Sequence, residues 1–271
     1  MTCAEGNRRR AAAVLLVLAP LALAFAACSP RERPAPAPAE PKAPAPAPPL
    51  APPTLSRAEL LRVVAEAADA SAAGAAYPNA ARELDGRRFV LRLPFGCEGP
   101  SAEAADTRLG YSVDVKRNAL RLTARPEVWT QAGWARALVG GADVESIEGF
   151  WLSRPWTASE ACPPLPAVAA AVPPTPETVG LAQPFAEGGS RLLRRGDRPY
   201  EATVKLPDGQ PPGPGGFRLV LEGRIAAGAD GRTVACLSEH PDRRPVCLAR
   251  AQLDRVAFET PAGETLAEWR S

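Results

Sequence analysis

The stretch Arg87-Arg88-Phe89-Val90-Leu91-Arg92-Leu93 alternates along its length and stops at Pro94 and Gly96. Alternation with a period of two is typical of a β-strand with one buried face, because successive side chains of a strand point to opposite sides. Proline and glycine commonly end such a run. The stretch therefore predicts a strand over 87–93, and it is the first of a series.

Further alternating runs lie on both sides of a proline-rich break at Pro163–Pro176. Before the break, Leu109–Lys116 and Ala119–Arg125 meet at Arg117-Asn118, which predicts a β-hairpin, and Glu145–Ser153 predicts one more strand. After the break, short runs between turn signals predict strands over Gly180–Ala186, Ser190–Arg194, Pro199–Leu206, Phe217–Ala226, Arg232–Leu237, Val246–Arg250 and Arg255–Thr260.

Helical signals are few and lie early in the chain. Ser56-Arg57-Ala58-Glu59 is a capping-box pattern, and the apolar residues that follow it recur at helical spacing. These signals predict a helix over Arg57–Ala72 that ends before Gly74. A short helical turn is expected between Pro126 and Ala137.

This order of elements predicts a mainly β fold, formally α+β, with an N-terminal helix. Short antiparallel strands at close spacing favour one or two small sandwich-like or barrel-like lobes. Thr260-Pro261-Ala262-Gly263 is expected to reverse the chain into a last segment that ends at Trp269. The proline-rich break predicts a boundary between a first lobe, 54–162, and a second lobe, 177–271.

Four cysteines fall in the predicted lobes: Cys97, Cys162, Cys236 and Cys247. An even number in an oxidising compartment indicates two disulfides, and four cysteines allow three pairings. We favour Cys97–Cys162 and Cys236–Cys247, because the proline-rich break separates these two pairs. The alternative is a metal site formed by Cys236, His240 and Cys247, whose spacing is unlike the paired C-x₂-C ligands of zinc sites. We therefore expect no bound metal.

The N-terminus carries targeting signals. Arg8, Arg9 and Arg10 precede an apolar run that is shorter than a membrane span and contains Pro20, which favours a cleaved signal peptide over 1–27. The run closes as Leu23-Ala24-Phe25-Ala26-Ala27-Cys28-Ser29. Its last residues, Phe25 to Cys28, resemble a bacterial lipobox, although leucine is usual where Phe25 stands. The alternative is an ordinary secreted protein cut nearby, which would leave Cys28 as a spare thiol.

The lipobox resemblance implies that Cys28 carries lipid and becomes the N-terminus of the mature protein. Several acyl chains on one residue make a stable membrane anchor. Ser29, where an aspartate would favour retention in the inner membrane, implies the outer membrane, facing the periplasm. Residues 28–53 then form the lipidated cysteine and a tether of proline, alanine and charged residues, a composition that favours an extended spacer rising ~3.1 Å per residue.

The charge of the mature chain gives no support to nucleic-acid binding. Of 32 basic and 30 acidic residues, 29 of each remain after three arginines and one glutamate leave with residues 1–27, so the formal charge is zero. A nucleic-acid-binding surface needs a basic excess. Phosphate-loop, dinucleotide-binding and H-E-x-x-H motifs are also missing from the sequence, and we expect no cofactor.

The residues that could perform catalysis are sparse. His240 is the single histidine, and a Ser-His-Asp system would have to combine it with Ser238 or Ser190, yet no G-x-S-x-G motif occurs. Asp143, Glu145 and Glu148 could in principle act as paired carboxylates in glycoside hydrolysis, but a solvated strand face explains them equally well. Arg195-Gly196-Asp197 is expected to be a turn. We assign no catalytic residue.

The one unusual concentration is aromatic: Trp129, Trp134, Trp151 and Trp156 lie within 28 residues. Such rings either fill a core or form a partly exposed face on which sugars and apolar ligands stack. The sequence leaves both interpretations open.

These observations predict a cell-envelope lipoprotein, held to the membrane by its N-terminal lipid, whose β-rich part is a non-enzymatic binding or structural module. Its partner is expected to be cell-wall glycan or another envelope protein. The alternative is a small envelope hydrolase that acts on cell-wall glycan or peptide.

Overall fold

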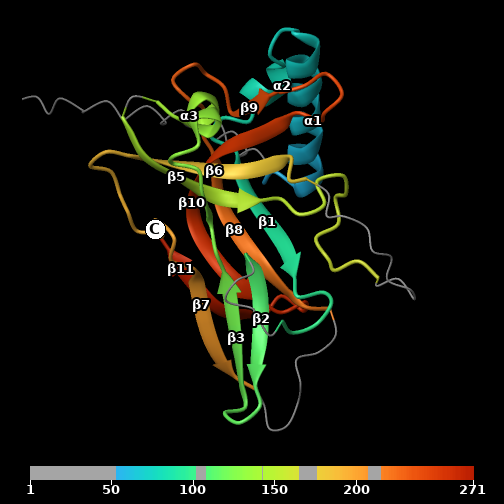
Figure 1. Cartoon of the computed structure of the whole chain (residues 1–271), viewed down its shortest axis with the longest axis vertical. Coiled ribbons are helices and arrows are strands. Elements are labelled where there is room, and N and C mark those ends of the chain that lie inside the picture. Colours follow the sequence, from blue (N-terminus) through green and yellow to red (C-terminus); the bar gives the residue numbers. More distant parts are fainter. Residues whose placement is uncertain (1–52, 102–107, 142, 165–175, 207–214) are drawn as a thin grey trace, which may run out of the picture. The chain divides into compact units, whose positions relative to one another are not determined.

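The computed structural model of the chain describes residues 53–101, 108–141, 143–164, 176–206 and 215–271. Every described residue belongs to one compact unit, Leu50–Ser271. The expected signal peptide, Cys28 and the tether as far as residue 52 lie outside the described residues. The fold is mainly β with an N-terminal helix, as the sequence predicts (Figure 1).

The larger sheet has the strand order β1-β8-β10-β6-β5-β4, and β9 and β11 also pair with β10. Each neighbouring pair is antiparallel except β6 and β10, which run parallel. The strands are β1 (Arg88–Phe95), β4 (Glu127–Val128), β5 (Val144–Trp151), β6 (Val179–Ala186), β8 (Phe217–Ile225), β9 (Val234–Leu237), β10 (Val246–Glu259) and β11 (Thr265–Arg270).

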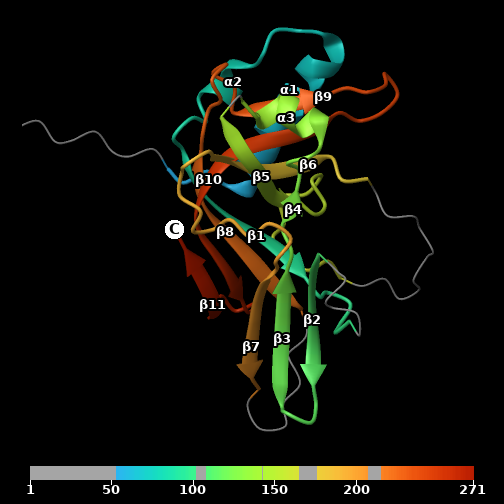
Figure 2. The same cartoon turned by 60° about the vertical axis from the view of Figure 1, so that its left-hand side comes forward.

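A smaller antiparallel sheet has the order β2-β3-β7, and it extends from the end of the unit opposite the helices (Figure 2). Its base packs on the larger sheet, where the Tyr111 ring lies edge-on to Phe217, with ring centres 4.9 Å apart. The predicted hairpin is confirmed, with Asp114 opposite Ala119 at its closed end. The remaining elements are β2 (Leu109–Asp114), β3 (Ala119–Ala124), β7 (Tyr200–Lys205), α1 (Arg57–Ala73), α2 (Asn79–Arg82) and α3 (Gly133–Val139).

The segments expected as two lobes share one sheet. β1 precedes the proline-rich break and pairs with β8, which follows it, and β5 and β6 likewise pair across the break. Residues 54–162 and 177–271 therefore contribute to one β unit, and neither sheet closes into a barrel. A proline-rich segment interrupts local backbone pairing, but it does not fix which distant strands meet.

Three of the predicted strand ranges need correction. Val246–Arg250 and Arg255–Thr260 belong to the single strand β10, which bends at a register shift between Leu253 and Arg255. Ser190–Arg194 forms no strand and contains a turn at Leu192 and Leu193. The side chains of Arg191 and Arg194 instead bind Glu145 of β5.

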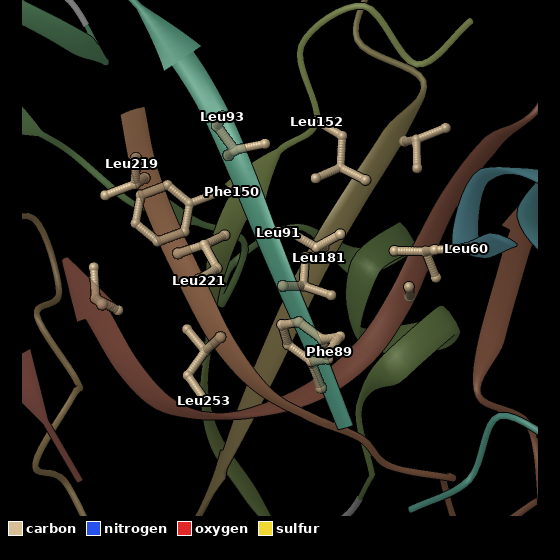
Figure 3. Close-up of a cluster of buried hydrophobic side chains, with 14 of the residues drawn as sticks. Leu60, Phe89, Leu91, Leu93, Phe150, Leu152, Leu181, Leu219, Leu221 and Leu253 are labelled. Atoms are coloured by element: carbon tan, nitrogen blue, oxygen red, sulfur yellow. The ribbon is translucent and has the colours of Figure 1, made fainter. Parts of the chain in front are cut away.

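The main core forms where α1, β1, β6 and β8 meet. Phe89, Leu91 and Leu93 of β1 are almost fully buried beside Leu219 and Leu221 of β8 (Figure 3). The side chains of β1 thus point in turn into this core and to the opposite face of the sheet, which is the alternation seen in the sequence. Burying a side chain of this size contributes about 1.5–3 kcal/mol relative to leaving it exposed.

Helix α1 starts and ends where its sequence signals place it. The Ser56 hydroxyl accepts a hydrogen bond from the backbone N–H of Glu59 at 3.2 Å, which caps the first turn. Gly74 ends the helix with a left-handed φ of 61°. The helix lies against β9, where the Ser71 hydroxyl donates to the Cys236 carbonyl at 3.2 Å. Across the described ranges, no helix has the length and apolar character that crossing a membrane requires.

Both favoured disulfides form. Cys97 bonds to Cys162, and Cys236 bonds to Cys247, its directly opposite neighbour across β9 and β10. The chain-entropy model assigns about 4 kcal/mol to the first bridge and about 3 kcal/mol to the second, since the first closes the longer loop. The alternative metal site with His240 is excluded, because both of its sulfur ligands are used in the disulfide.

Glycine at position 149 is required where β5 meets β6. A Cβ atom on Gly149 would lie 2.0 Å from the Leu181 carbonyl oxygen and 2.8 Å from the Trp129 ring. We expect Gly149→Ala to cost about 3 kcal/mol or more, because the strands would have to separate. Gly133→Ala is the control: its Cβ meets nothing within 4 Å, and alanine is the better helix residue.

Urea unfolding of both variants measures the difference. A Gly149→Ala protein as stable as Gly133→Ala would contradict the close packing of β5 on β6.

Candidate ligand-binding site around Trp156

The structure divides the four tryptophans. Trp129, Trp134 and Trp151 pack together in a small second core beside β5 and β6. The centres of the Trp129 and Trp151 rings are 5.0 Å apart at a T-shaped angle, and Trp134 stacks on Trp151 at 6.3 Å. Trp156 is 59% exposed. Of the two interpretations that the sequence leaves open, the core applies to these three rings, and Trp156 is the exposed ring of the four.

Two neighbouring hollows share Trp156, Pro176 and Glu177; we call them hollow A, of about 350 Å³, and hollow B, of about 550 Å³. Together they form the Trp156 site. Both volumes lie in the range of small-ligand sites. Hollow A is further lined by Arg108, Leu109, Arg125, Glu127, Phe150, Trp151, Leu152, Ser153, Arg154 and Pro155, and hollow B by Thr178, Leu237, Glu239, Arg243, Arg244 and Val246.

The charged groups of hollow A are largely paired with one another. The Nε of Arg108 lies 2.9 Å from a carboxylate oxygen of Glu127, and an Nη atom of Arg108 also binds Glu177. Arg154 donates to the Ala161 carbonyl at 2.9 Å. The charges of Arg108, Glu127 and Glu177 at the rim of hollow A thus compensate one another. The buried side chains of Phe150 and Leu152 form its apolar floor.

Hollow B differs in charge. Arg243 and Arg244 are exposed on its wall, and within the described ranges neither guanidinium makes an ion pair or side-chain hydrogen bond. Glu239 and Glu177 are its acidic groups. Hollow B therefore offers uncompensated cationic donors next to the exposed Trp156 ring.

Arg57, at the start of α1, positions the loop that carries Trp156. Its Nε donates to the Thr157 carbonyl at 3.0 Å, and its Nη2 donates to the carbonyls of Ser153 and Arg154 at 2.5 and 3.1 Å. Arg57 is only 3% exposed, and burial lowers the pKa of its guanidinium, with Glu160 acting in the opposite direction. The side chain thus holds three backbone acceptors in a fixed arrangement.

The same loop contains an unfavourable backbone conformation. Arg154 has a φ of 52°, in the left-handed region that favours glycine. Such a residue persists only where surrounding contacts determine its conformation. The three hydrogen bonds from Arg57 supply those contacts, so the projection of Trp156 depends on α1.

The candidate carboxylates have structural roles. Glu148 is buried, and one of its carboxylate oxygens accepts the backbone N–H groups of Arg195 and Gly196 at 2.8 and 3.0 Å. Glu145 binds Arg194 and Arg191, and Arg194 foremost holds the pKa of Glu145 below its usual range. The solvated-face interpretation is therefore wrong for Glu148, which fixes the Arg195-Gly196-Asp197 turn.

His240 lies in an exposed loop, where its Nδ1 accepts the backbone N–H of Asp242 at 3.2 Å. The Ser238 hydroxyl lies 3.3 Å from the Ser71 hydroxyl instead. Among the described residues, no hydrogen bond joins His240 to Ser238 or Ser190. Neither serine is therefore placed to be activated by His240 in a Ser-His-Asp arrangement.

The sequence gives little indication of three residues of this site. Arg57 occupies an ordinary first-turn helix position, and Arg243 and Arg244 occur in a polar turn like many others in an arginine-rich chain. Only the burial of Arg57 and the absence of partners for Arg243 and Arg244 in the described ranges distinguish them, and both are tertiary properties.

We predict that Arg57→Met destabilises the Trp156 loop. The change leaves three partly buried carbonyls without a donor, at a cost of about 2 kcal/mol or more. Faster hydrogen exchange is expected at the Thr157 amide, which bonds to the Arg154 carbonyl within the loop. Arg62→Met is the control, because Arg62 is exposed on the same helix and pairs with Glu66. Equal exchange at Thr157 in the two variants would show that Arg57 does not hold the loop.

The Trp156 site thus combines one exposed indole, two hollows and a loop held by Arg57. No protein-family model, no curated protein and no solved structure matches this chain.

Proposed function

We propose that this protein is a lipid-anchored, non-enzymatic component of the bacterial cell envelope that binds cell-wall glycan through the Trp156 site. The observation that carries the proposal is the exposed Trp156 ring between two hollows of ligand size. Flat indole faces stack on the apolar faces of sugar rings, and hollows on both sides give room for consecutive rings of a chain.

The shape of the surface favours a glycan over a protein partner. A stable protein–protein interface buries about 800 Å² on each partner around an apolar centre. The Trp156 site instead places one exposed aromatic ring among charged side chains in concave surroundings. Sugars combine apolar ring faces with hydroxyl groups, which suits this mixture.

The anchor follows from the lipobox-like residues at the N-terminus, with Cys28 as the lipidated residue. Lipid at Cys28 would hold the protein at the outer membrane, facing the periplasm. Residues 30–53 would then carry the folded part toward the wall. The hydrolase alternative has less support, because Glu145 and Glu148 are engaged in ion pairs and backbone hydrogen bonds.

We predict that Cys28→Ala abolishes lipidation. The thiol is the proposed attachment point, so the variant should stay unprocessed or become soluble in the periplasm, and labelled palmitate should not be incorporated. Palmitate labelling of the variant at the wild-type level would contradict the anchor.

We predict that Trp156→Ala weakens binding of the full-length protein to purified cell walls by roughly tenfold, which corresponds to ~1.4 kcal/mol. The loss reflects the stacked ring and the apolar surface it buries. Leu192→Ala removes another exposed apolar side chain, 68% exposed and away from both hollows, and should bind as the wild type does. Co-sedimentation at graded wall concentrations measures the affinities.

If the Trp156→Ala variant binds purified cell walls with the affinity of the wild type, the Trp156 site is not the glycan-binding site. Recovery of envelope proteins in place of wall glycan, lost in the same variant, would show that Trp156 contacts a protein partner.

A further inference from the structure

Hollow B contains two arginines, Arg243 and Arg244, that form no ion pair with any residue the structure describes. Arg108 in hollow A binds two carboxylates, whereas Arg243 and Arg244 in hollow B have no ion-pair partner among the described residues. Exposed arginines of this kind bind an external anion without first breaking an internal ion pair. The guanidinium group presents paired N–H donors that match the two oxygens of a carboxylate.

The turn that carries these arginines is fixed at its base. It connects β9 to β10, and the Cys236–Cys247 disulfide joins the two strands at directly opposite positions. Within the turn, the Arg243 backbone N–H donates to the His240 carbonyl at 3.1 Å. A cross-linked turn loses less conformational freedom when it binds a ligand, so the donors are partly pre-organised.

We propose that hollow B binds the carboxylate of an acidic glycan while Trp156 stacks on the adjoining sugar ring. The proposal rests on the glycan-binding function above and names the class of glycan. Trp156 lines both hollows, so a ring on its indole lies beside the wall that carries Arg243 and Arg244. Of the two acidic groups on the same rim, Glu177 is already paired with Arg108, which reduces its repulsion of an anion bound at the arginines.

Specificity divides between the two parts of the site. Stacking on Trp156 does not depend on charge, so neutral and acidic sugars both gain from it. Contact with Arg243 and Arg244 is available only to the acidic sugar. Because both arginines are exposed, added salt screens this second contribution and leaves stacking intact.

Two disaccharides that differ by one acidic group test the proposal. N-acetylglucosaminyl-N-acetylmuramic acid carries a lactyl carboxylate, and N,N′-diacetylchitobiose has similar rings without it. Titration calorimetry with the full-length protein in detergent should show roughly tenfold tighter binding of the acidic sugar at low salt, consistent with charge-assisted hydrogen bonds. The ratio should shrink as salt is raised.

The double variant Arg243→Ala/Arg244→Ala should bind both sugars with the affinity that the wild type has for the neutral one. Lys116→Ala/Arg117→Ala is the matched control, since it removes the same charge from the exposed β2–β3 turn and should keep the tenfold ratio. Arg243→Lys/Arg244→Lys keeps the charge without the paired donors and should retain only part of the ratio.

The outcomes separate this proposal from the proposed function. Equal wild-type affinity for the two sugars, lost for both in Trp156→Ala, would overturn the carboxylate site and leave glycan binding standing. A tenfold ratio that survives in Arg243→Ala/Arg244→Ala would also overturn it. Failure of both sugars to bind would refute the glycan function and the carboxylate site together.

Discussion

The backbone hydrogen bonds of β10 connect the parts of this fold. The first half of the strand bonds to β6 and β9, and the second half bonds to β8 and β11. The pairing with β8 begins at Ala251 and shifts register between Leu253 and Arg255, as a bulge allows a long strand to bend. Beyond the bend, Arg255 binds Glu222 at 2.5 Å and Glu268 at 2.7 Å, which ties β8 and β11 to the same strand. The Cys236–Cys247 disulfide and the second core both include residues of this strand, Cys247 and Leu248.

The Trp156 site depends on that framework at two points. Leu237 at the end of β9 and Val246 at the start of β10 line hollow B. Each lies next to a cysteine of the Cys236–Cys247 disulfide, which therefore holds this wall in place. The loop that projects Trp156 depends on α1 through Arg57, which is buried beside it. Arg57 lies only a few residues after the end of the proposed tether.

The sequence predicted the elements well where local signals were strong. The capping box placed the start of α1 at Arg57, and alternation found β1 and the β2–β3 hairpin. The prediction failed at Ser190–Arg194, a short run between turn signals that contains a turn in the structure and whose Arg194 side chain binds Glu145 and Glu148 of β5. The tryptophan cluster shows the same limit. Three of its rings fill a core and one is exposed, a difference that depends on which strands meet and that spacing along the chain does not encode.

The sequence by itself determined the class of the fold and the start of α1, because both depend on patterns of residues that are close in the chain. The favoured cysteine pairing is confirmed, but Cys97 and Cys162 lie 65 residues apart, so the number of cysteines alone did not select it. Only the tertiary structure decided that 54–162 and 177–271 form one β unit, that Arg57 holds the Trp156 loop, and that Arg243 and Arg244 face a hollow without a counter-ion in the described ranges. The physical reason is that strand pairing, burial and charge compensation arise between residues far apart in sequence. Short-range patterns carry no information about which distant partner each residue will meet.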